Sequence, residues 1–237
     1  MTTMVHLPKQ GLNRYGILRI LTLMIFMALL SALLFIAAGR IDWVWGWVYV
    51  GLYVAILTIN GIFLIAKNPE LVNVRGQPRS DTKGWDKVFV WVAALPWLAI
   101  PVVAGLDVRY GWSVPMNLNL HFAGIIVFVL GNLLAFSAVL ENRHFETTVR
   151  IQQDRGHQVI TTGPYRFVRH PGYVGVILTM IGTPLILGTW WAFVPGALVM
   201  VAILYRTVRE DRTLRRELAG YAEYAQRTRS RLLPGIW

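Results

Sequence analysis

The sequence contains no cysteine and few acidic residues. Without cysteine the chain can form no disulfide, no thiolate metal site and no cysteine nucleophile, which leaves its redox compartment open. Charged residues make up only 15% of the 237 positions, and 12 Asp and Glu stand against 23 Lys and Arg. Apolar residues make up 55% and fall in long blocks, which is too apolar for an ordinary soluble domain. A single membrane domain is therefore expected.

The excess of basic residues gives a formal charge of +11, which by itself would suit a nucleic-acid-binding protein. However, the basic residues lie in short loops beside apolar blocks, where membrane orientation and anionic lipids explain them. We therefore expect anionic lipids as partners and no nucleic acid. The first apolar block is too long for the core of a signal peptide, so no cleavable signal peptide is expected.

Four apolar blocks are long enough to cross a bilayer as helices. They are Ile17–Gly39, Trp43–Ala66, Val88–Leu106 and Leu120–Leu140. Pro96 and Pro101 predict a kink or break in the third block. Gly124 and Gly131 mark a face of the fourth block that another helix can approach closely. Asn132, within the same block, is expected to hydrogen-bond between helices.

Two shorter apolar segments follow, Gly172–Thr189 and Trp190–Tyr205, with a turn at Gly188. Each is near the minimum length for spanning, so we predict a helical hairpin; a hairpin that enters without crossing is the alternative. The chain then has about six membrane segments, and its fold class is an all-α polytopic membrane helix bundle. It is expected to form one domain, with a four-span region at 1–140 and a second region at 141–237.

With six spans both termini lie on one side of the membrane. That side receives 21 of the 23 basic residues, including Lys9, while only Arg40 and Arg109 lie opposite. The positive-inside rule makes the crowded side cytoplasmic. The sequence therefore predicts a multi-pass protein of the bacterial inner membrane with cytoplasmic termini.

The most polar stretch between two apolar blocks is 157–175, HQVITTGPYRFVRHPGYVG. Gly163-Pro164 and His170-Pro171 each place a proline where a helix can begin, because its missing N–H costs nothing at the first helical position. The next N–H groups point out of the helix end, where a carboxylate or phosphate can bind. The stretch predicts a pocket for a small anion or nucleotide at the cytoplasmic membrane interface.

This stretch closely resembles the cofactor-binding segment of isoprenylcysteine carboxyl methyltransferases and their bacterial relatives. These are integral membrane enzymes that use S-adenosyl-L-methionine. The resemblance runs from about Glu141 to the C-terminus, and RHPGYVG with GPY before it is its most specific part. Phospholipid N-methyltransferases and, more loosely, membrane sterol reductases share that core. The resemblance therefore implies the family more firmly than the substrate.

The resemblance also implies which positions contact the cofactor. They are His157, Gln158, Val159, Ile160, Tyr165, His170, Pro171, Gly172 and Tyr173. The resemblance also implies a glutamine upstream of these positions. Gln152 or Gln153 can take this role if the family's pattern is shifted in register against this sequence. The alternatives are a helix-capping role for His170 and interfacial aromatic roles for Tyr165 and Tyr173. No metal site is expected, because His157 and His170 have no third ligand at helical spacing.

Near the end of the last apolar segment, Arg206 and Glu210 lie four residues apart on one helical face. In the resembled family an arginine at this place faces the substrate carboxylate and a glutamate faces the cofactor. Asp211 could take the role of Glu210, because the register near Gly220 is one residue short. The alternative for the pair is a surface salt bridge.

The tail from Arg206 to Trp237 has apolar positions at three-four spacing and arginines mostly off that face. It predicts a cytoplasmic amphipathic helix that Gly220 can interrupt and Pro234 ends. One interpretation is that this helix lies on anionic lipid, another is that its first turn closes the active site, and the two can coexist. Arg166 and Arg169 are interpreted as lipid-headgroup contacts.

The resulting hypothesis is a methyltransferase that takes a lipophilic small molecule or lipidated substrate from the bilayer. A carboxylate acceptor is favoured, because with a pKa of about 4 it is ionised at neutral pH and needs no general base. Phospholipid or lipid amine N-methylation is the closest alternative. A hypothesis of another class is a membrane transporter or structural membrane protein, because broken helices with polar turns also line transport sites.

Overall fold

The computed structural model describes residues 11–237, and within them the chain is helical without strands. The α-helices are α1 (Arg14–Ala38), α2 (Val44–Lys67), α3 (Pro69–Gly76), α4 (Gly84–Tyr110), α5 (Leu118–Glu141), α6 (Pro171–Leu187), α7 (Phe193–Glu217) and α8 (Tyr221–Arg227). Two 3-10 helices, η1 (Gln153–Arg155) and η2 (Gly163–Arg166), lie in the loop between α5 and α6. Helices α1, α2, α4 and α5 are long and apolar enough to cross a membrane, and α6 is a shorter apolar helix. The predicted fold class is confirmed.

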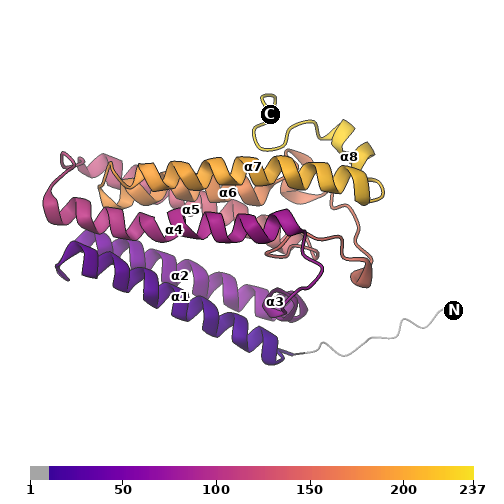
Figure 1. The fold of residues 1–237 in the computed structure, drawn as a ribbon, viewed down its shortest axis with the longest axis horizontal. Coiled ribbons are helices and arrows are strands. Elements are labelled where there is room, and N and C mark those ends of the chain that lie inside the picture. Colours follow the sequence, from indigo (N-terminus) through magenta and orange to yellow (C-terminus); the bar gives the residue numbers. More distant parts are fainter. Residues whose placement is uncertain (1–10) are drawn as a thin grey trace.

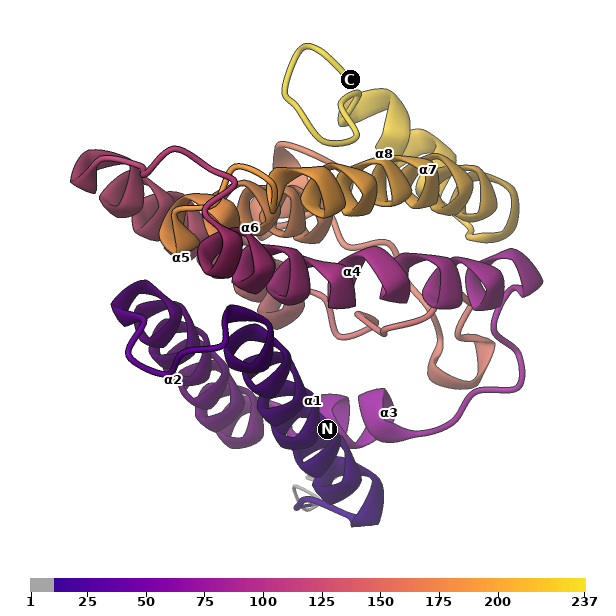
Figure 2. The ribbon, with the colours of Figure 1, turned by 60° about the vertical axis from the view of Figure 1, so that its left-hand side comes forward.

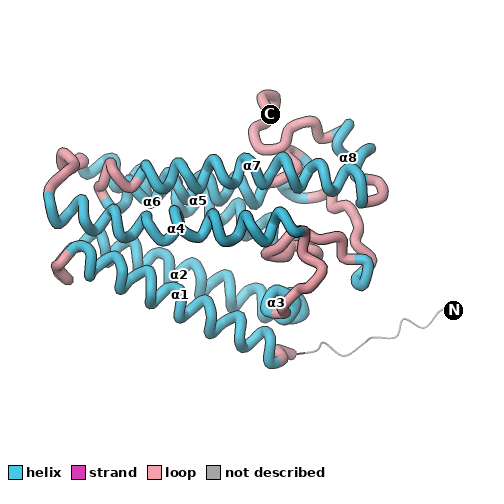
Figure 3. The backbone as a smooth tube through the Cα atoms, viewed as in Figure 1, coloured by secondary structure: helices cyan, strands magenta, loops and turns pink. Residues whose placement is uncertain are grey.

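The long helices lie side by side along the long axis of the molecule (Figure 1). Figure 2 shows α1, α2 and α3 grouped on one side of α4, with α6 and α7 on the other. The longer loops gather with α3 and α8 at one end of the bundle, which we call the loop end (Figure 3). The start of α1 and the C-terminus both lie at this end, as an even number of crossings requires. Lys9, counted toward this side, lies outside the described residues.

Glycines allow α5 and α6 to pack closely, as predicted. A Cβ atom on Gly131 would lie 2.7 Å from the carbonyl oxygen of Gly175, and one on Gly124 would lie 2.6 Å from the Leu185 side chain. Asn132 donates to the Phe128 carbonyl at 2.9 Å and to the Thr179 hydroxyl at 3.4 Å, so it does hydrogen-bond across to α6. In a bilayer such close approach supplies the dispersion contacts that hold helices together.

The structure refines and extends the prediction for the first half of the chain. Helix α4 continues through Pro96 and Pro101, so the break that was one of the two expected outcomes does not occur, and the kink stays a prediction. An unpaired backbone group in lipid costs more than the strain of a proline, and neighbouring helices support the distorted turn. The connection between α2 and α4, about which the apolar blocks say nothing, contains α3, in which Asn68 caps the N-terminus by accepting from Leu71 N–H at 3.0 Å.

The tail also differs from the prediction. Its first part is not a separate element but the second half of α7, which runs unbroken from Phe193 to Glu217. Gly220, with φ of +79°, starts α8, which ends at Arg227 rather than at Pro234. The apolar face predicted to lie on lipid packs on the protein instead, where Leu218, Tyr221 and Ala225 are buried against the α5–α6 loop.

Candidate active site

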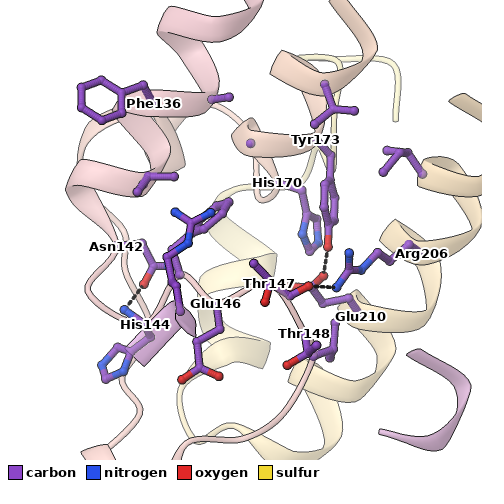
Figure 4. Close-up of a pocket in the computed structure, with 18 of the residues that line it drawn as sticks. Phe136, Asn142, His144, Glu146, Thr147, Thr148, His170, Tyr173, Arg206 and Glu210 are labelled. Atoms are coloured by element: carbon purple, nitrogen blue, oxygen red, sulfur yellow. Dashed lines mark hydrogen bonds between the residues drawn. The ribbon is translucent and has the colours of Figure 1, made fainter. Parts of the chain in front are cut away.

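A cavity of about 710 Å³ opens inside the loop end of the bundle. Its polar part is lined by the α5–α6 loop, the start of α6 and the second half of α7 (Figure 4). Its apolar part continues between α1, α2, α4 and α5, where Leu23, Leu57, Trp97 and Phe136 line it. The site therefore joins a polar compartment to an apolar one within the membrane-spanning helices.

Most residues that the sequence predicted to form a site line this one cavity. They are Gln152, His157, Gln158, Val159, Ile160, Tyr165, His170, Gly172, Tyr173, Arg206 and Glu210. Pro171 and Asp211 are not among the lining residues. Between the two candidate glutamines, Gln152 is buried and faces the cavity while Gln153 is exposed.

His144 organises the polar loop at the cavity wall. Its Nε2 accepts from Arg143 Nε at 3.1 Å and lies 3.4 Å from the backbone nitrogen of Gln158. These bonds leave the proton on Nδ1, which lies 3.3 Å from the Oε1 acceptor of Gln152. Gln152 in turn donates to the His144 carbonyl at 2.6 Å. This hydrogen-bond network holds the His144 ring neutral and fixes the loop segment that carries Gln158.

His157 is also held neutral. Its ring centroid lies 4.7 Å from that of His144. Burial, followed by repulsion from His144 and nearby arginines, lowers the pKa of His157 to about 4. Burial likewise lowers the pKa of His144. At neutral pH both rings can therefore line a site without adding positive charge to it.

The His-Pro-Gly-Tyr turn opens α6 at the cavity. Proline at the first helical position leaves the Gly172 N–H without a hydrogen bond within residues 11–237. A Cβ atom on Gly172 would lie 2.9 Å from the Phe145 ring, so only glycine fits this position without displacing the ring. His170 does not cap the helix through its side chain, which contradicts that alternative. Instead its ring stacks on Tyr173, with centroids 5.6 Å apart.

Arg206 reaches the cavity from α7 and is paired with Asp86, a residue the sequence did not suggest. Arg206 Nε lies 3.1 Å from Asp86 Oδ1, and Nη2 donates to Asp86 Oδ2 at 3.1 Å and to the Thr147 carbonyl at 2.8 Å. Asp86 is fully buried and also accepts from the Val149 N–H at 2.7 Å. Nη1 makes no hydrogen bond within the described residues and remains a free donor. An acid in the first turn of a largely apolar helix was the available signal in the sequence.

Glu210 and Asp211 point to different places. Glu210 lines the cavity and its carboxylate accepts from the Tyr173 hydroxyl (Figure 4). No salt bridge joins it to Arg206 in the described part of the chain, so the surface-pair alternative is wrong. Asp211 is 1% exposed and lies outside the cavity. Of the two candidate acids, Glu210 therefore faces the cavity and Asp211 does not.

Asp211 is instead the centre of a buried ion cluster. It pairs with Arg169 at 2.7 Å, Arg231 at 3.1 Å and Arg215 at 3.2 Å, and the Tyr221 hydroxyl donates to it at 3.0 Å. Burial would raise the pKa of Asp211, but the nearby His170 and the Arg169 guanidinium hold it well below its usual range. Arg169 is therefore not a lipid-headgroup contact: its side chain is 1% exposed and also donates to the carbonyls of residues 228 and 229.

Comparison with known proteins identifies the region that builds this cavity. Residues 119–219 match the model of a family described as phospholipid methyltransferase. A probable protein-S-isoprenylcysteine O-methyltransferase of Oryza sativa is 31% identical over 114 residues, which is 47% of this chain and 60% of the rice protein. Protein-S-isoprenylcysteine O-methyltransferase B of Arabidopsis thaliana is 27% identical over 45% of this chain and 56% of its own length. The protein of that name in Schizosaccharomyces pombe is 33% identical over 30% of each chain.

The chain thus spans less than two thirds of the length of these relatives, and the matches cover less than half of the chain itself. The matched family model includes α5, the polar loop, α6 and α7, which supply most of the polar cavity wall. Through this region, the chain is similar to protein-S-isoprenylcysteine O-methyltransferases and to the phospholipid methyltransferase family.

Proposed function

We propose that this protein is an S-adenosylmethionine-dependent membrane methyltransferase that transfers a methyl group to the carboxylate of a lipophilic substrate. The observation that carries the proposal is the continuity of the cavity, which joins the polar loop end to an apolar space among the membrane-spanning helices. A cofactor from the aqueous side and a substrate from the bilayer can therefore meet at one place.

The residues present fit the cofactor. The Gly172 N–H at the start of α6 is free within residues 11–237 and suits a carboxylate. The buried His170 ring lines the same wall, with its Nε2 turned toward Asp211 at 3.6 Å. Tyr165, Val159 and Ile160 offer an aromatic and aliphatic wall for adenosine, and the volume is within the roughly 300–1,000 Å³ typical of ligand pockets. When bound, S-adenosylmethionine supplies an electrophilic sulfonium methyl group.

Arg206 and Glu210 would act on the reacting groups, each held by a neighbouring side chain. Arg206 would hold the acceptor carboxylate through its free Nη1, while Asp86 fixes the guanidinium from the other side. Glu210, held by the Tyr173 hydroxyl, would place a negative charge beside the cationic donor. Because the carboxylate is already ionised, none of these groups needs to remove a proton. A dry apolar cavity favours the step, since opposite charges neutralise each other as methyl transfer proceeds.

Lipid amine N-methylation is the second candidate, favoured by the description of the matched family as phospholipid methyltransferase. The test is to titrate the purified protein in detergent with S-adenosylhomocysteine by calorimetry, and then to supply labelled S-adenosylmethionine with membrane lipids. Binding followed by a base-labile methylated product supports the carboxyl ester, and a base-stable product supports the amine. No binding at sub-millimolar ligand would contradict both and favour a transporter.

The role of Arg206 is tested by Arg206→Lys, which keeps a positive charge beside Asp86 but removes the planar fork. We expect methyl transfer to fall by at least about tenfold while S-adenosylhomocysteine affinity stays within about twofold, because Arg206 is proposed to touch the acceptor and not the cofactor. An equal loss of binding and transfer would contradict this role.

A further inference from the structure

The cavity contains two arginines that have no counter-charge. Arg19 of α1 and Arg75 of α3 both line it. Within residues 11–237 neither guanidinium makes a hydrogen bond or approaches a carboxylate within 4.0 Å, whereas Arg150, Arg169 and Arg206 are all paired. The unpaired arginines therefore need an explanation that the ion pairs of the fold do not supply.

Local packing holds the two arginines next to each other. A Cβ atom on Gly76 would lie 2.1 Å from the carbonyl oxygen of Tyr15 and 3.1 Å from Cβ of Arg19, so α3 lies directly against the first turns of α1. Asn73 locks this contact by accepting from the Asn13 N–H at 3.0 Å. Burial, followed by the charge of Arg19, lowers the pKa of Arg75 to about 10. That value is still above neutral pH, so two like charges stand together in a partly dry cavity.

Such an arrangement is unfavourable without a partner. A buried charge is normally paired, and like charges at short range repel most strongly where water is scarce. An oxyanion between two guanidinium groups would relieve both costs, and arginine donors match the oxygens of carboxylate and phosphate. The pair is thus a receptor for a carboxylate or a phosphate.

The surroundings indicate what carries that oxyanion. From Arg19 the same face of α1 continues into the bundle with Leu23 and Phe26, both of which line the cavity. Seven residues of helix place Phe26 about 10 Å deeper than Arg19. The charge therefore lies at the loop end of an apolar wall, which suits an amphiphile with an anionic head and a hydrocarbon chain.

One aromatic ring connects this receptor to the candidate active site. The guanidinium of Arg75 lies over the Phe145 ring, 5.5 Å from its centroid. The same ring also packs against Gly172, in the turn that opens α6. An oxyanion held at Arg75 is therefore close to the place proposed for methyl transfer.

We infer that Arg19 and Arg75 bind the carboxylate or phosphate of a membrane amphiphile, and that this amphiphile is the methyl acceptor. The second part rests on the proposed function. A carboxylate at this site would identify an acidic acceptor, which would pass from the arginine pair to the free Nη1 of Arg206 for methyl transfer. A phosphate would be the headgroup of a phospholipid whose amine is methylated. The identity of the bound oxyanion therefore separates the two candidate reactions.

The test uses the full chain in neutral-lipid nanodiscs and measures binding of oleate and of phosphatidic acid, with oleyl alcohol and diacylglycerol as uncharged counterparts. Arg19→Gln and Arg75→Gln are compared with Arg14→Gln, which removes one charge from the same helix at an exposed position. We expect oleate, phosphatidic acid or both to bind at least about tenfold more weakly to the first two variants. Binding to Arg14→Gln and binding of the uncharged counterparts should change by less than about twofold.

Loss of oleate binding alone assigns a carboxylate, and loss of phosphatidic acid binding alone assigns a phosphate. Equal affinity of Arg14→Gln, Arg19→Gln and Arg75→Gln for both anions would overturn the inference. A second readout guards against misfolding: because the two charges repel, removing either should leave the unfolding temperature unchanged or higher. S-Adenosylhomocysteine affinity is measured in parallel, so a failure of the proposed function is distinguished from a failure of this site.

Discussion

At the scale of single residues, adjacent acids in α7 have different surroundings. Glu210 faces the cavity with Tyr173, and Asp211, one position on, is enclosed by Arg169, Arg215 and Arg231. A helix turns about 100° between neighbours, because it has roughly 3.6 residues per turn, so consecutive side chains necessarily meet different environments. Consecutive positions of α7 thus carry one acid that faces the cavity and one acid that lies in a buried ion cluster.

We predict opposite results for substitution of these two acids. Asp211→Ala leaves the Arg169 guanidinium buried without a counter-charge and should lower the free energy of unfolding by about 3–5 kcal/mol. Glu210→Ala should change stability by less than about 1 kcal/mol but weaken S-adenosylhomocysteine binding, because its carboxylate faces the cavity. Unfolding in detergent, followed by tryptophan fluorescence, and calorimetric titration measure the two effects. Similar effects of both substitutions would argue against the division of roles.

His157 predicts a pH dependence. Its pKa lies near 4 in the folded chain, below the ordinary value of 6.5, so the unfolded chain binds more protons between these values. The contribution of neutral His157 to the free energy of unfolding should therefore be fully present above pH 6.5 and should decline as the pH falls toward 4. Carboxylates titrate in the same range, so the informative quantity is the difference between the wild type and His157→Gln, measured at pH values of about 4.5 and about 7. The proposed shift is wrong if the two proteins lose stability equally.

At the scale of elements, the contact between α5 and α6 positions the site. Gly124 and Gly131 let α6 approach α5, and Gly175 and Gly182 do the same from the α6 side. This contact fixes the start of α6, where the His-Pro-Gly-Tyr turn opens into the cavity. The position of the His-Pro-Gly-Tyr turn relative to the loop that carries His144 and Gln152 therefore depends on the glycines in the α5–α6 contact.

Gly131→Ala tests this dependence. The added Cβ would lie 2.7 Å from the Gly175 carbonyl oxygen, with no flexible side chain that could yield, so we expect a loss of about 1–3 kcal/mol in unfolding free energy. Gly51→Ala in α2 is the matched control, because a Cβ atom added there would have no other atom within 4 Å. Alanine there should be neutral or stabilising by up to about 1 kcal/mol. If thermal unfolding shows equal effects at both positions, the close α5–α6 contact is not needed.

At the scale of the whole molecule, the bundle has one elaborate end and one simple end. The loop end carries α3, the α5–α6 loop, α8 and the C-terminal segment, while the opposite end has only short connections (Figure 3). An ion network of Arg150 with Glu146, Asp81 and Asp154 ties the loops together there. The molecule therefore concentrates its polar structure on one side of the apolar helices.

The absence of cysteine makes the orientation directly testable. Single cysteines are introduced at Ser80, exposed in the loop before α4 at the loop end, and at Val114, exposed in the short connection before α5. If the basic side is cytoplasmic, a membrane-impermeant maleimide added to intact bacterial cells labels the variant at 114 and spares the variant at 80. Permeabilised cells should show labelling of both. The reverse pattern would place the cavity mouth outside the cell.

The sequence by itself determined the fold class, because apolar blocks of about 20 residues can cross a bilayer only as helices. It also indicated part of the cavity lining, since the stretch 157–175 and Arg206 with Glu210 are local patterns. Such patterns are legible because proline, glycine and helical spacing act over a few residues.

Only the tertiary structure decided which charges are paired. Asp86 reaches Arg206 across 120 positions, and Arg19 meets Arg75 through the packing of α3 on α1, so no local spacing relates either pair. For the same reason, the different surroundings of Glu210 and Asp211 became visible only once α7 was placed against the α5–α6 loop and α8. A charge acquires its role from what surrounds it in space, and that depends on contacts between segments far apart in the chain.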